Sequence, residues 1–354
     1  MTDHDGENFN QWDLQQEPKT TSDTVGLIIN TIKDIEPLDD QFGVDPKKTV
    51  PPALYDLFFG QRDPTTVSND PKDAPPLQTY AILDAAKIAN LPQLLASTEL
   101  EYRCLFKGQA YDELKDVAPW IVTLKEHNTF TRNLFSHDPK DPAPWHNWDK
   151  EPGIFIRSQA SLDDIWRHFR KFTKVQDEAG KWYYLRFYDP KIAFPYITQS
   201  ERFSERILNV PTARQSTSMV IIDKTNAHHI KLAEVPTKPS AGIYVMDHHD
   251  KDIFRALTFI SRANVLLEKL KDSFSFETDN DAYRDAIITT MHRMHQYGFR
   301  QKRQLEQLAT WDIFYGPNFE KNDPEGHLLD ICLRQDIDSA EKFSDFCKRL
   351  NEIY

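Results

Sequence analysis

The chain has 354 residues, a net charge of −12 and 39% hydrophobic residues, enough for one large domain or two ordinary ones. The acidic charge argues against nucleic acid as the main partner, because phosphate binding needs a basic face. Three scattered cysteines, a polar acidic start and no apolar run of membrane-spanning length predict a cytoplasmic protein without membrane insertion.

The first part of the chain carries most of the negative charge. Residues 1–76 hold 15 Asp and Glu against 6 Lys and Arg. One apolar island, Val25 to Ile32, indicates a short helix or strand packed on the body, and Ala53 to Phe59 reads as a helix that starts after Pro51-Pro52. We therefore expect 1–76 to be an acidic extension with a short docked helix, and the body to fold without residues 1–50.

From Leu77 the pattern alternates between apolar strands and short helices. Tyr80 to Ala85, Tyr102 to Phe106 and Trp120 to Leu124 have strand character, with helical segments between them. Such alternation is typical of right-handed crossover units. It predicts an α/β lobe over 77–210 with a mixed, largely parallel sheet flanked by helices. A β-rich connecting segment over 211–250 and an all-helical lobe over 251–354 complete the expected domain organisation.

The segment Gly180 to Pro190 stands out because an arginine interrupts a run of aromatic residues. Trp182 to Tyr188 predicts a central strand buried on both faces. A charge in such a strand needs a partner, so we expect Arg186 to pair with Asp84 or Asp189.

The polar residues around this segment permit two interpretations. Asp84, His168, Arg186 and Asp189 would form a catalytic cluster at the end of a sheet, or, together with Arg170, a structural network of ion pairs and caps. The structural interpretation is favoured, since charges of this kind often serve structure as well as catalysis. The sequence contains no nucleophile elbow, Walker loop or GxGxxG motif. The histidine pairs lack the spacing of a metal site, so neither a metal nor a cofactor is expected.

Two tryptophans in a proline-rich loop, Trp145 and Trp148, are candidates for anchoring a partner. Packing of one or both against the core is an equally good interpretation.

Several motifs together resemble one family. His168-Phe169-Arg170 and Leu185 to Pro190 are similar to the paired signature of the domain of unknown function 4123. The similarity extends from Tyr80 to Tyr354 and departs from the family pattern at Ala86 and His146, where the family has glycine. Further matching segments are Tyr80 to Ala86, Cys104 to Gly108, Ala118 to Val122, Trp145 to Trp148 and Gln296 to Gly298.

The resemblance implies a function in type VI secretion. Members of the family are adaptor chaperones, so this chain would be a non-catalytic adaptor that binds a cognate effector and loads it onto a VgrG or PAAR spike protein. The effector-facing surface is expected in residues 251–315, with Phe254, Tyr297 and Trp311 as contacts. The alternative is a hydrolase-like enzyme that uses Asp84, His168 and Asp189.

Overall fold

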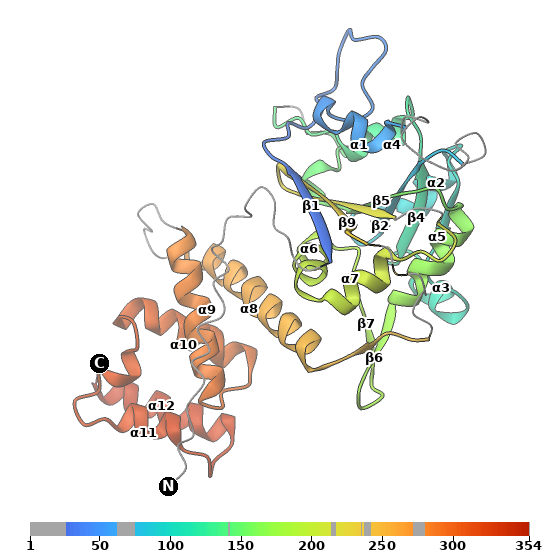
Figure 1. Cartoon of the computed structure of the whole chain (residues 1–354). Helices are drawn as coiled ribbons and strands as arrows, with labels where there is room; N and C mark the ends of the chain where they lie inside the picture. The colour runs from blue at the N-terminus through green and yellow to red at the C-terminus, as the bar shows by residue number, and fades with distance from the viewer. Residues whose placement is uncertain are drawn as a thin grey trace. The chain divides into compact units, whose positions relative to one another are not determined.

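The computed structural model describes residues 26–61, 75–140, 142–213, 217–234, 236, 242–271 and 280–353. Internal contacts divide the chain into two compact units, 1–250 and 251–354, and each is described by itself. Figure 1 shows a first unit built on a sheet and a second built from helices.

The first unit contains a seven-stranded sheet with the strand order β1-β9-β8-β5-β2-β4-β3. Every pair of neighbouring strands in it is antiparallel. Its strands are β1 (Leu27–Ile32), β2 (Gln78–Asp84), β3 (Tyr102–Cys104), β4 (Pro119–Leu124), β5 (Gly153–Ser158), β8 (Ser218–Asp223) and β9 (Asn226–Leu232).

The prediction of a largely parallel sheet was therefore wrong, although the sequence alternates strands and helices as expected. Strands β2 and β3 do run in the same direction, but β4 lies between them and is antiparallel to both. The apolar runs were misleading because helices cover both faces of the sheet. Residues of β2 and β4 are buried on either side, which gives the continuous hydrophobic pattern that is typical of parallel strands.

Short helices pack on the two faces of this sheet. Helices α5, α6 and α7 contact strands β4, β5, β8 and β9 on one face. Ser161 caps α5 by accepting the Asp164 N–H, a role typical of serine before a helix. The helical segments of the unit are η1 (Pro52–Leu54), α1 (Tyr55–Phe59), α2 (Leu91–Ala96), α3 (Gln109–Leu114), α4 (Thr129–Leu134), η3 (Trp148–Lys150), α5 (Leu162–Phe169), η4 (Arg170–Phe172), α6 (Pro190–Gln199) and α7 (Glu201–Leu208).

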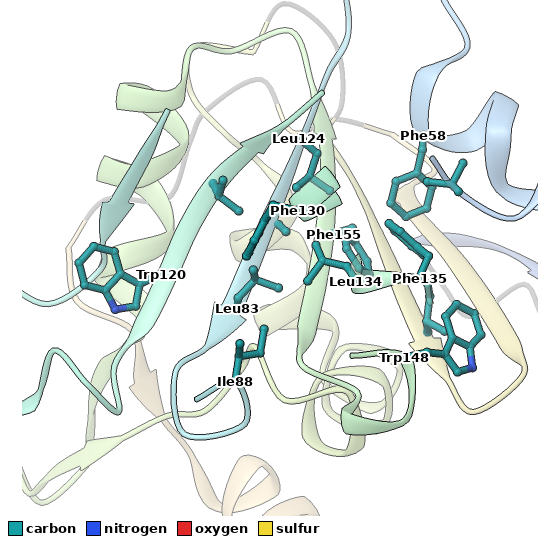
Figure 2. Packing of buried hydrophobic residues seen from close by; sticks show 14 of the residues in the cluster. Phe58, Leu83, Ile88, Trp120, Leu124, Phe130, Leu134, Phe135, Trp148 and Phe155 are labelled. Atoms are coloured by element: carbon teal, nitrogen blue, oxygen red, sulfur yellow. The ribbon is translucent and has the colours of Figure 1, made fainter. Parts of the chain in front are cut away.

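The opposite face of the sheet carries a cluster of buried aromatic and aliphatic side chains. The rings of Phe58, Phe135 and Phe155 point toward one another in Figure 2, with centroids 5.0–5.3 Å apart. Trp148 packs beside Phe135 at the edge of this group, with the ring centroids 6.4 Å apart. The cluster thereby joins α1, α4 and the sheet into one core.

The apolar island near the start of the chain forms a strand of the main sheet. Leu27 pairs with Leu232 and Ile32 with Ala227 along the antiparallel β1–β9 ladder. Figure 1 shows this blue strand beside the yellow strand β9. Ile35, Leu38 and Val50, which follow β1, belong to the buried cluster. Residues 26–50 are therefore a structural part of the first unit, and we now expect the body to need them for its stability.

A second, three-stranded sheet has the order β10-β6-β7. It consists of β6 (Lys174–Asp177), β7 (Trp182–Tyr184) and β10 (Val245–Met246). The predicted central strand Trp182 to Tyr188 is therefore not in the main sheet: its first three residues form an edge strand with exposed side chains, and the chain then turns. Because Leu185, Phe187 and Tyr188, which follow the strand, are buried, the run looked uniformly internal in the sequence.

The second unit is helical, and its core lies between residues 259 and 350. Trp311 stacks on Phe343 and Phe346 inside it, with ring centroids 6.0 and 6.3 Å apart. The unit boundary falls within the first of its helices, which are α8 (His248–Lys271), α9 (Asn280–Gln296), α10 (Lys302–Tyr315), η5 (Phe319–Lys321), α11 (His327–Leu333) and α12 (Ser339–Ile353).

Candidate functional site

A polar junction joins the end of β2 to the start of α6. Arg186 donates a hydrogen bond to the buried carboxylate of Asp84 and lies 3.6 Å from Asp189. These are the two partners that the sequence offered. Burial by itself lowers the pKa of Arg186, but the carboxylates of Asp84 and Asp189 raise it above its usual value. The arginine side chain is 46% exposed, so it covers Asp84 from the solvent side.

Both carboxylates of the junction also bind backbone N–H groups. Asp84 accepts the Ala86 N–H at 2.9 Å, and Asp189 caps α6 by accepting the Lys191 N–H. Lys87, which the sequence analysis did not select, donates to Asp189 at 3.1 Å. A carboxylate that is occupied in this way fixes the chain and has little freedom to act as a base.

A second carboxylate group lies next to this junction. Lys87 also donates to the backbone oxygen of Glu151, whose carboxylate is 2.9 Å from Lys191. Burial raises the pKa of Asp223, and the neighbouring carboxylate of Glu151 raises it further. Burial also acts to raise the pKa of Glu151, but Lys191 lowers it below its usual value.

The structure does not bring His168 into this junction. Its Nε2 atom is 2.9 Å from the backbone oxygen of Ile207, and its ring packs against Phe169 and Phe172. Burial lowers the pKa of His168 to about 4, so the ring is neutral at physiological pH. Arg170 lies over the ring of Trp166, 5.1 Å from its centroid. The proposed catalytic trio of Asp84, His168 and Asp189 is thus not assembled.

An open cavity of about 660 Å³ lies on another part of the first unit. Two exposed aromatic side chains line it, Phe42 with 85% and Trp145 with 55% of its surface accessible. The loop after β1, helix α4 and the loop before η3 form its walls, with the remaining lining from Asp39, Asp40, Lys47, Thr129, Arg132, Asn133, Ser136, Pro142, Ala143 and Pro144.

Hydrogen bonds hold the loop that carries Trp145 although the indole is exposed. The buried His146 ring accepts the Ala143 N–H through Nδ1, so its Nε2–H donates to Asp40 at 3.1 Å. The backbone oxygen of Trp145 accepts a hydrogen bond from the Asn147 side chain at 2.8 Å. A large ring on a fixed backbone loses little entropy when it binds, which is typical of interface hot spots.

The five residues predicted to contact a partner differ in exposure. Trp145 is exposed at the cavity, whereas Trp148 is buried and belongs to the core. In the second unit Tyr297 and Trp311 pack against the helical core, and Phe254 is partly buried. Phe42 was missed by the sequence analysis, and the only hint was an aromatic residue before Gly43 in a polar loop.

Metal-binding groups and membrane-spanning helices are both absent from the described part of the chain. No group of three or more His, Cys, Asp or Glu side chains there is placed to hold a metal ion. No helix there has both the length and the apolar character needed to cross a membrane.

The fold and these sites define the first unit as an α/β unit on an antiparallel sheet, with an internal charged junction and an exposed aromatic cavity. Residues 79–203 match the family model described as Domain of unknown function (DUF4123), and this part of the chain is a domain of that family. The match is shorter than the span Tyr80 to Tyr354 expected from the motifs. No curated protein and no solved structure matches the chain.

The matched domain extends from β2 to α7 and includes the whole Asp84–Arg186–Asp189 junction. It also includes Trp145, whereas Phe42 lies before it. Strands β1, β8 and β9 of the main sheet fall outside the match.

Proposed function

We propose that this chain is a non-catalytic adaptor of a type VI secretion system. It binds a cognate effector in the cytoplasm and loads it onto a VgrG or PAAR spike protein. The DUF4123 domain at 79–203 supports the proposal through the family's association with this secretion system. The fixed and exposed Trp145 beside the cavity is the structural observation that carries it, because such aromatic anchors dominate protein interfaces.

The arrangement of Asp84 and Asp189 is consistent with a non-catalytic protein. Their carboxylates bind Arg186, Lys87 and backbone N–H groups, and the histidine that a hydrolase would pair with them hydrogen-bonds Ile207 instead. The polar junction therefore supports the fold in this proposal, and binding takes place at the surface.

Co-expression with the products of neighbouring genes tests the function. The tagged chain is captured and the complex is sized by gel filtration. We expect a stoichiometric complex with a toxin-like product that is insoluble when expressed alone. If the full-length chain forms no complex with any neighbouring product, the adaptor function is rejected.

Matched variants connect that complex to the cavity. Trp145→Ala is expected to weaken binding by roughly tenfold or more, the size of a hot-spot loss. Leu94→Ala is the control, because Leu94 is 42% exposed but does not line the cavity. Equal binding by both variants would remove the cavity from the interface while leaving the adaptor function in place.

A further inference from the structure

The outer face of the small sheet carries exposed apolar side chains. In the β6–β7 ladder, Trp182 pairs with Gln176 and Tyr184 with Lys174. In the β10–β6 ladder, Val245 pairs with the same Gln176. Directly paired residues point to the same face, so these side chains lie together. Trp182, Tyr184 and Val245 are 43%, 59% and 40% exposed. A sheet face with this much exposed apolar surface is typical of a binding site.

The free edge of this sheet is β7. Thr173 pairs with Leu185 and Asp177 with Lys181 through backbone hydrogen bonds, so the alternate residues Trp182 and Tyr184 direct their backbone N–H and C=O groups away from β6. Within the described residues, these outward groups have no hydrogen-bond partner. The opposite edge differs, because Arg202 donates to the backbone oxygen of Val245 at 2.7 Å. Of the two edges of this small sheet, as far as the described residues show, β7 is the one whose outward backbone groups are open for strand addition.

Exposed lysines surround this edge although the chain as a whole is acidic, with a net charge of −12. Lys174 lies 5.0 Å from the centroid of the Trp182 ring and 5.9 Å from that of Tyr184. Phe106 contacts the Tyr184 ring, and the neighbouring Lys107 lies over the ring of Trp166, 4.4 Å from its centroid. Glu178 is an exposed acidic residue in the β6–β7 turn. Lys181 lies over the ring of Tyr183, 5.1 Å from its centroid. In the described part of the chain, neither Lys174 nor Lys181 forms an ion pair to a carboxylate.

We propose that β7 binds an extended, acidic segment of a partner protein as an added strand. The segment would pair with the backbone of Trp182 and Tyr184, and its acidic side chains would face Lys174 and the neighbouring lysines. A second copy of this chain fits less well, because its lysines would repel those of the first. The inference deepens the proposed adaptor function. It rests on that function in one respect, namely that the partner is a protein.

This edge and the Trp145 cavity involve different residues. Figure 1 shows α4, which lines the cavity, and β7 at opposite ends of the first unit. The two surfaces would therefore allow one adaptor to hold two partners at once.

Binding of a short synthetic peptide to the full-length chain tests the inference. The probe is a fluorescein-labelled peptide of alternating Glu and Val, measured by fluorescence anisotropy at low salt. Two comparison probes are a Lys and Val peptide of equal length and a labelled oligothymidylate. We expect saturable binding of the acidic peptide only, weakened by added salt. No binding of the acidic peptide, or equal binding of either comparison probe, would overturn the inference.

Variants separate the backbone and charge contributions. Tyr184→Pro removes both the ring and the outward backbone N–H, whereas Tyr184→Thr removes the ring but keeps the N–H. The proline variant should therefore bind the peptide roughly fivefold more weakly than the threonine variant. Lys174→Glu should weaken binding by roughly tenfold, while Lys269→Glu in the second unit serves as the charge control. Thermal unfolding checks that each variant is folded.

The variant results also have defined contrary outcomes. Equal affinity of the proline and threonine variants would exclude strand addition, and an unchanged affinity of Lys174→Glu would exclude the acidic partner. The peptide assay uses no secretion protein. A negative result in it can therefore be distinguished from a negative result in the co-expression experiment. Peptide binding without any partner complex rejects the adaptor function, and the reverse result rejects the β7 surface.

Discussion

The two units of this chain are assembled over different distances in the sequence. In the first unit, Thr31 hydrogen-bonds His228, which is 197 residues away in the sequence. Arg186 hydrogen-bonds Asp84, which is 102 residues away. In the second, the partly buried Arg293 binds the buried carboxylates of Asp312 at 2.6 Å and Glu320 at 3.0 Å, all within neighbouring helical segments. The sheet of the first unit thus depends on a strand near the start of the chain. The core of the second unit is built entirely from residues between 259 and 350.

Truncation should produce the largest difference between the units. Removing residues 1–50 deletes β1 and the buried Ile35, Leu38 and Val50, each worth roughly 1.5–3 kcal/mol. We expect the first unit to lose its cooperative unfolding transition and the helical unit to keep its own, as followed by calorimetry. Removing residues 1–25 is the comparison, since the difference between the two truncations reports on 26–50 alone. An unchanged first transition would show that β1 is dispensable.

In the second unit, Arg293→Ala should destabilise the helices by ~3–5 kcal/mol, because it leaves two buried carboxylates without their cation. Urea unfolding followed by far-ultraviolet circular dichroism measures the change. Arg334→Ala is the control, since its pair with Asp336 is exposed to solvent and its loss should change stability little. Equal effects of the two variants would mean that burial does not set the strength of this network.

His168 should make the stability of the first unit depend on pH. Its pKa is about 4 in the folded chain against 6.5 for an unperturbed histidine, so the unfolded chain binds the extra proton first as the pH falls. Stability is therefore full above 6.5 and decreases toward 4, by ~3 kcal/mol in total.

The variant His168→Phe should flatten this decrease, although it also leaves the backbone oxygen of Ile207 without its hydrogen bond. Tryptophan fluorescence during urea unfolding is a suitable measurement, because five of the six tryptophans in the described residues lie in the first unit. The same slope in both proteins between pH 4 and 6.5 would contradict the assignment to His168.

The smallest effect is expected at the polar junction. Arg186→Ala leaves the buried Asp84 carboxylate with the Ala86 N–H as its remaining partner at 2.9 Å, which should cost ~2 kcal/mol. The loss stays below that of a fully buried pair, because Arg186 is 46% exposed. Lys191→Ala, whose lysine side chain is 69% exposed, should change stability by less than about 0.5 kcal/mol. If Lys191→Ala lowered the free energy of unfolding more than Arg186→Ala, the Lys191–Glu151 ion pair would be the main interaction that holds α6.

The sequence by itself determined the local features and the pairing of Arg186. The caps at Ser161 and Asp189 and the helical character of the second unit follow from nearest neighbours along the chain. The partner of Arg186 was predictable because a charge in an apolar run needs an opposite charge. These properties depend on residue type and short spacing.

Only the tertiary structure decided the strand order and the surfaces. Strand β4 lies between β2 and β3 and runs antiparallel to both, and no spacing in the sequence encodes which strand enters a gap. Trp145 and Trp148 are three residues apart in one loop, yet one is 55% exposed and the other 8%. Burial is set by contacts such as that of Trp148 with Phe135, which depend on how distant segments pack and not on residue type alone.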